Sequence, residues 1–118
     1  MSTNFSNLDE LFQIVTSRAK NTVLDPSVPK ASLHIELTGN DHRDWFLELI
    51  PPQVNFRNFN GDDCSLTVTL TDKDFLGIVN KTLNLNRAFL LGKIKLNGDV
   101  SLAGKVMKVL RQIYEDKN

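Results

Sequence analysis

The stretch from Cys64 to Thr71 alternates apolar and polar side chains without interruption, and it limits the possible folds more than any other segment. Its apolar members are Cys64, Leu66, Val68 and Leu70, and its polar members are Ser65, Thr67, Thr69 and Thr71. Successive side chains of a β-strand point to opposite faces of the sheet, so the pattern predicts a strand with one buried and one wet face. Such strands are typical of antiparallel sheets that carry helices on one face only.

Four further segments have the alternation or the composition of strands: residues 33–38, 45–50, 53–60 and 93–97. In the first of these, apolar side chains alternate with His34, Glu36 and Thr38. In the last, lysines lie on the predicted outer face, which is a common way to protect the edge of a sheet. The pattern through Val54 and Phe56 in residues 53–60 is the weakest of these. The sequence therefore predicts a largely antiparallel sheet of several strands.

Four segments show the helical spacing of apolar residues: residues 8–19, a short segment carrying Phe75, Leu76 and Val79, residues 85–91, and residues 100–114. Each follows side chains that can accept a hydrogen bond from the free amides of a first helical turn. These candidate caps are Ser6 or Asn7, Thr71, Asn84 and Asp99. Gly92 is placed to end the third helix in the left-handed conformation. The predicted fold is α+β with two layers, a sheet covered on one face by helices.

The last predicted helix is strongly amphipathic. Its inward face contains Leu102, Ala103, Val106, Met107, Leu110, Ile113 and Tyr114. Its outward face contains Lys105, Lys108, Arg111 and Gln112. Because it follows a glycine hinge at Gly98, we expect this helix to act as a lid that admits a ligand.

The chain has 118 residues and a single cysteine, Cys64. This length predicts one domain spanning residues 1–118. One cysteine excludes a framework of internal disulfides and is typical of a reducing compartment. No secretory signal is recognisable at the N-terminus, and no apolar run is long enough to span a membrane. We therefore expect a cytosolic protein.

Charge is distributed unevenly, although the formal net charge is zero. Residues 81–111 contain seven basic residues against Asp99 alone, whereas residues 1–80 are acidic overall. A neutral chain is a poor candidate for nucleic-acid binding. Five of the cations lie on predicted outward faces and could dock on an anionic membrane: Lys93, Lys95, Lys105, Lys108 and Arg111. The alternative is that they form an ordinary solvated surface.

Residues that could carry catalysis are few. His42-Arg43-Asp44 matches the start of a protein-kinase catalytic loop, but the chain lacks the surrounding elements and is too short for that fold. His34, His42 and Cys64 have no recognisable zinc spacing. No pair of nucleophile and base can be proposed, so we expect neither enzymatic activity nor a metal or cofactor.

The segment from Asp63 to Leu110 resembles the C-terminal half of the type-2 sterol carrier protein family. The resemblance rests on the threonine-rich strand running into TDKDF, then NRAF, then GKIKLNGD and the amphipathic helix that follows. It implies a five-stranded sheet covered by helices, with an apolar tunnel between the layers. It also implies non-covalent carriage of fatty acids, acyl-CoA, sterols or phospholipids.

Apolar residues on the predicted helices would then contact the lipid. They are Phe12, Val15, Phe75, Leu76, Val79, Phe89, Leu102, Val106, Met107 and Leu110. For each of them the alternative is simple packing in a core. For the whole chain the alternative function is the same fold used as a ligand-free module for protein interaction or oligomerisation.

Overall fold

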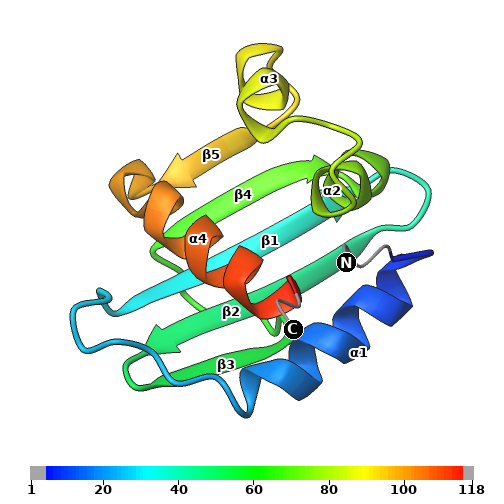
Figure 1. Ribbon diagram of the computed structural model, residues 1–118. Helices are drawn as coiled ribbons and strands as arrows, with labels where there is room; N and C mark the ends of the chain where they lie inside the picture. Colours follow the sequence, from blue (N-terminus) through cyan, green and yellow to red (C-terminus); the bar gives the residue numbers. More distant parts are fainter. Residues whose placement is uncertain (1–4, 116–118) are drawn as a thin grey trace.

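The computed structural model describes residues 5–115 and contains one five-stranded sheet with helices on one side (Figure 1). Along the chain the elements are α1 (Leu8–Ala19), β1 (Ala31–Thr38), β2 (Arg43–Ile50), β3 (Gln53–Asn58), β4 (Leu66–Thr71), α2 (Asp72–Val79), α3 (Leu85–Leu90), β5 (Lys95–Gly98), a short 3-10 turn (Val100–Leu102) and α4 (Ala103–Tyr114). The strand order is β3-β2-β1-β4-β5. Only the β1–β4 pair is parallel, and the other three pairs are antiparallel. The α+β class and the largely antiparallel sheet are confirmed.

The core lies between the sheet and helices α1, α2 and α4, which cross the same face (Figure 1). Every second residue of β1 is buried, as its alternation predicts. Arg18 of α1 donates hydrogen bonds to the carbonyl oxygens of Ile113 and Tyr114, at 3.3 and 3.0 Å. These carbonyls belong to the last turn of α4, where a cation is favoured. Arg18 thereby joins the two helices that cover the sheet.

The caps of α1, α2 and α3 occur where the sequence places them. The side chains of Asn7, Thr71 and Asn84 accept hydrogen bonds from the amides of Glu10, Asp74 and Arg87, respectively. Each of these bonds satisfies one of the free N–H groups of a first helical turn. Of the two candidate caps for α1, the structure uses Asn7.

Strand β4 begins two residues later than the alternation indicates. The amide of Ser65 bonds to the hydroxyl of Ser32 at 2.9 Å, so a side chain takes the place of a ladder partner there. Cys64 consequently lies outside the strand, and it is half-buried rather than in the core.

The last helix also begins differently from the prediction. The carboxylate of Asp99 accepts the amide of Ser101 at 3.2 Å, and the carbonyl of Asp99 accepts the amide of Leu102 at 3.1 Å. A bond that spans three residues closes a 3-10 turn, and the α-helix starts only after it. No helix within residues 5–115 has the length and apolar character needed to cross a membrane.

Candidate functional site

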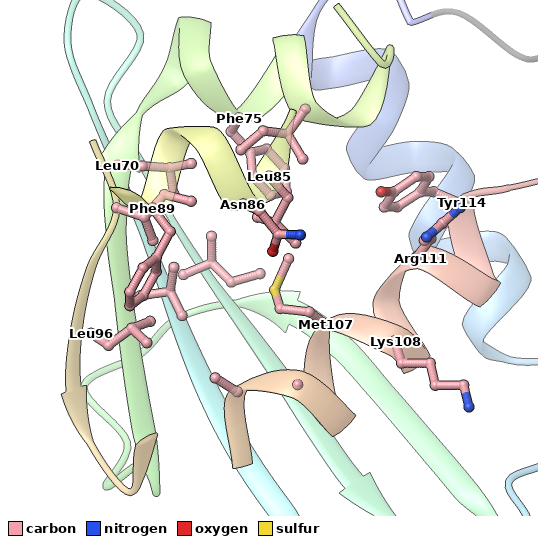
Figure 2. A pocket seen from close by; sticks show the side chains of 16 residues that line it. Leu70, Phe75, Leu85, Asn86, Phe89, Leu96, Met107, Lys108, Arg111 and Tyr114 are labelled. Carbon is pink, nitrogen blue, oxygen red and sulfur yellow. The ribbon is translucent and has the colours of Figure 1, made fainter. Parts of the chain in front are cut away.

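An apolar cavity of about 320 Å³ lies between the sheet and helices α2, α3 and α4 (Figure 2). Its lining residues are Ile35, Val68, Leu70, Phe75, Ile78, Leu85, Asn86, Phe89, Ile94, Leu96, Ala103, Gly104, Met107, Lys108, Arg111 and Tyr114. Ligand sites of small molecules typically occupy about 300–1,000 Å³ and have mostly apolar walls. The cavity therefore has the size and the chemistry of a ligand site.

The floor of the cavity is the inner face of the sheet. Ile35 of β1 lies directly opposite Val68 of β4 in the parallel register, and Leu70 follows on the same face. The alternation of each strand points these side chains away from water and toward the helices. Met107 of α4 points into the space above them (Figure 2).

Helix α3 contributes an apolar wall that is only loosely attached. Its one buried residue is Ala88, which is fully enclosed, whereas Phe89 is 52% exposed and Leu90 is 85% exposed. Phe89 and Leu85 line the cavity and reach solvent at the same time. The cavity therefore opens beside α3, and its opening carries exposed apolar side chains.

Most polar groups lie on the α4 side of the cavity, at the end away from Phe89 and Leu96, and the exception is the amide of Asn86 on α3 (Figure 2). Arg111 donates from Nε to Glu115, whose other carboxylate oxygen lies 3.4 Å from Nζ of Lys81. The hydrogen bond between Arg111 and Glu115 lowers the pKa of the Glu115 carboxyl group and raises the pKa of the Arg111 guanidinium. Burial raises the pKa of the Tyr114 phenol above its ordinary value of 10.0, and the phenol is a hydrogen-bond donor at neutral pH even without this shift.

The ten residues expected to contact a lipid fall into two groups. Three of them line the cavity: Phe75, Phe89 and Met107. Val15, Val79, Val106 and Leu110 are buried in the core, and Phe12, Leu76 and Leu102 pack half-buried against it. Phe12 lies within an aromatic group, with ring centroids 5.4 Å from Trp45 and 5.3 Å from Phe56.

Sequence reasoning about helical faces missed the sheet residues and Tyr114 as lining residues. The signal for the sheet residues was available, because strand alternation already predicts Ile35, Val68 and Leu70 to point inward.

The five cations expected to face outward are all exposed. Lys93, Lys95 and Lys105 are separate from the cavity lining. Lys108 and Arg111 are exposed as predicted, but they also line the cavity. The prediction that they face only outward is therefore corrected. The reason is geometric, because Met107 on the inner face of α4 is followed directly by Lys108 on its outer face. The boundary between the inner and outer faces of this helix runs along the edge of the cavity.

A second polar cluster lies on the other face of the sheet, and cross-strand pairing assembles it. Glu36 and Asp44 are direct partners in the β1–β2 register. Asp44 hydrogen-bonds both His34 at 2.8 Å and His42 at 2.9 Å. Burial acts to raise the pKa of Asp44, but the two histidine hydrogen bonds outweigh it and lower that pKa. Ligand atoms of Glu36, His42 and Asp44 lie within 4.8 Å of one another, so these side chains could hold a divalent cation.

Comparison with known proteins connects the chain to one family. The model of the SCP-2 sterol transfer family matches residues 8–111. Human hydroxysteroid dehydrogenase-like protein 2 is 29% identical over 107 residues, which are 90% of this chain and 25% of that protein. The chain thus spans about a quarter of the length of the curated relatives it matches.

Solved structures with the same fold include two sterol carrier proteins. The apo form of sterol carrier protein 2 from Yarrowia lipolytica superposes with a TM-score of 0.70 at 22% identity, covering 98% of this chain and all of that one. The solution structure of palmitated SCP2L2 from Aedes aegypti superposes with a TM-score of 0.60 at 30% identity, covering 83% of this chain and 92% of that one.

Proposed function

Because the chain belongs to the SCP-2 sterol transfer family, we propose that it binds one long-chain lipid in the cavity and transfers it without covalent chemistry. The ligand classes are a fatty acid, a fatty acyl-CoA, a sterol or a phospholipid. We place a single fatty acyl chain first, because a cavity of about 320 Å³ is at the lower end of the range for ligand sites. The palmitated relative supports the same choice.

The observation that carries this proposal is the apolar lining of the cavity. Sheet and helix side chains supply most of the lining as hydrocarbon, and the polar groups are Asn86 of α3 and three side chains on the α4 side. Burial of one methylene group stabilises a complex by about 0.8 kcal/mol, so a dozen would contribute on the order of 10 kcal/mol. Association costs of several kcal/mol still leave micromolar or tighter binding.

Transfer requires contact with a membrane, and we propose an anionic bilayer as the surface. Lys93 and Lys95 follow α3 closely along the chain, Lys105 lies in the first turn of α4, and all three are exposed, as are the cavity-lining Lys108 and Arg111. The exposed Phe89 and Leu90 can enter the interfacial region while the cations meet lipid phosphates. A cytosolic location, to which the unpaired thiol of Cys64 is suited, gives access to such bilayers.

The second candidate function is a ligand-free interaction module, and the exposed apolar side chains of α3 favour it. A patch made of Phe89, Leu90 and Leu91 could contact another protein rather than a lipid. The two functions differ in one respect that can be measured: only the carrier takes up an acyl chain in solution.

The test is a titration of delipidated protein with a fluorescent fatty acid. Met107→Trp fills the space above the sheet and is expected to weaken uptake by about tenfold or more. Met107→Leu is the matched control, since it nearly conserves volume and is expected to bind like the wild type. Absence of uptake by the wild type would reject the carrier and favour the module.

A further inference from the structure

Three polar side chains of α4 lie along one edge of the cavity: Lys108, Arg111 and Tyr114. Residues three apart on an α-helix are neighbours on one face, so these positions form a continuous stripe. Figure 2 places Arg111 and Tyr114 together at one end of the cavity, with Phe89 and Leu96 at the opposite end. Apart from the amide of Asn86, which lies between the two ends, the lining is polar at the end of Arg111 and Tyr114 and hydrocarbon at the end of Phe89 and Leu96.

Tyr114 carries a hydrogen-bond donor that the protein does not use. The residue is only 6% exposed, and its hydroxyl has no hydrogen-bond partner within residues 5–115. Its ring lines the cavity, and in Figure 2 the hydroxyl points toward the cavity interior. Among the described residues, the fully buried side-chain polar atom without a partner is Nε1 of Trp45, so the Tyr114 hydroxyl is not completely enclosed. It can therefore donate a hydrogen bond to an occupant of the cavity.

The charges beside Tyr114 do not balance. The carboxylate of Glu115 is shared between Arg111 and Lys81, while Lys108 has no ion-pair partner in the described part of the chain. Three cations and one anion leave a net positive charge at this end. Glu115 engages only Nε of Arg111, so the terminal N–H groups of the guanidinium can still donate to an anion.

We propose that Lys108, Arg111 and Tyr114 bind the carboxylate of a fatty acid whose tail lies against Met107 and the sheet. This inference rests on the proposed function and adds the head-group chemistry to it. Arg111 and the phenol of Tyr114 donate hydrogen bonds to the carboxylate. The ammonium of Lys108 points away from the cavity in Figure 2, and its flexible side chain turns toward the carboxylate when the lipid binds. Hydrogen bonds of this charge-assisted kind are the strongest that side chains form, and they select an anion over a neutral group of equal length.

The test compares palmitate with hexadecan-1-ol, a neutral lipid of the same chain length, in competition with a neutral fluorescent probe. The wild type is expected to bind palmitate about tenfold or more tightly than the alcohol. Lys108→Gln/Arg111→Gln is expected to lose this preference while its affinity for the alcohol is unchanged. Lys93→Gln/Lys105→Gln also removes two positive charges, but from exposed positions outside the cavity lining. This variant is expected to keep the preference for palmitate.

Two single variants separate head-group binding from folding. Lys108→Gln breaks no ion pair within residues 5–115, and Tyr114→Phe removes only the hydroxyl, so both should remain folded. Each is expected to weaken palmitate binding severalfold and to leave the alcohol unaffected. Equal wild-type affinity for palmitate and alcohol, or unchanged selectivity in the double variant, would overturn the head-group site alone. Failure of both lipids to bind would instead overturn the proposed function.

Discussion

Gly98 lies directly against the carbonyl oxygen of Ser65, and a β-carbon at position 98 would stand 2.5 Å from that oxygen. The backbone of Gly98 has a φ of +111°, which side chains rarely adopt. The same carbonyl accepts the amide of Asp99 at 2.8 Å, so it cannot move aside without losing that bond. A glycine here lets β5 end against β4 and lead at once into α4, which walls the cavity.

Gly98→Ala is expected to lower the free energy of unfolding by about 2 kcal/mol or more, because it adds both a clash and a strained φ. Gly104→Ala is the matched control. A β-carbon at Gly104 meets nothing within 4 Å, so alanine should raise the free energy of unfolding by up to about 1 kcal/mol. Denaturant unfolding of both variants measures the difference. Equal stability of the two would contradict the close contact with Ser65.

The ion pairs of Glu115 make stability depend on pH in the acidic range. Its hydrogen bond with Arg111 lowers the pKa of Glu115 below the ordinary value of 4.5. A depressed pKa contributes stability that is present above 4.5 and is lost as the pH falls through the lower value in the folded protein. In unfolding titrations between neutral pH and pH about 3, Glu115→Gln should therefore lose less stability than the wild type. Parallel curves for the two proteins would show that this pair contributes nothing.

Helix α3 is expected to be the segment that opens for the ligand. The sequence alone favours the last helix as a lid, but α4 buries five side chains: Val106, Val109, Leu110, Ile113 and Tyr114. Helix α3 buries only Ala88, and elements with few buried contacts open most easily. Hydrogen exchange should therefore slow on lipid binding mainly in residues 85–90. A gain in protection concentrated in α4 would restore the first expectation.

Charge reversal tests the membrane contact. Lys93→Glu/Lys95→Glu/Lys105→Glu leaves the cavity lining intact, and each cation near an anionic bilayer contributes about 1 kcal/mol. The variant should transfer lipid more slowly to anionic vesicles at low salt. Its transfer to neutral vesicles and its affinity for free fatty acid should match the wild type. Equal transfer rates to both vesicle types would mean that these lysines form only a solvated surface.

Local rules predict most of the fold. The helix expected over residues 8–19 has those bounds, because apolar spacing and the Asn7 cap act within a few residues. The weak pattern near Val54 and Phe56 is strand β3, a sheet edge whose remaining residues are exposed. The parallel β1–β4 pairing joins distant parts of the chain, and no local pattern specifies it.

The cavity was harder to predict than the fold. Periodicity indicates which side chains point inward, but not whether neighbouring side chains fill the space they point into. Val106 and Met107 are adjacent and both on the predicted inner face, yet Val106 is in the core and Met107 lines the cavity. A rotation of about 100° along the helix separates them. The next step of about 100° along the helix places Lys108 at the cavity edge.

The most direct test of lipid binding in this cavity is an isotope-filtered NOE measurement on methyl-labelled protein with bound palmitate. We predict NOEs from the acyl chain to the methyl groups of Met107 in α4, Ile78 in α2 and Ile94 just before β5, all of which line the cavity. The methyl groups of Val15 and Val79, which are buried but lie outside the lining, should show none. NOEs to Val15 and Val79 without any to Met107 would contradict the account.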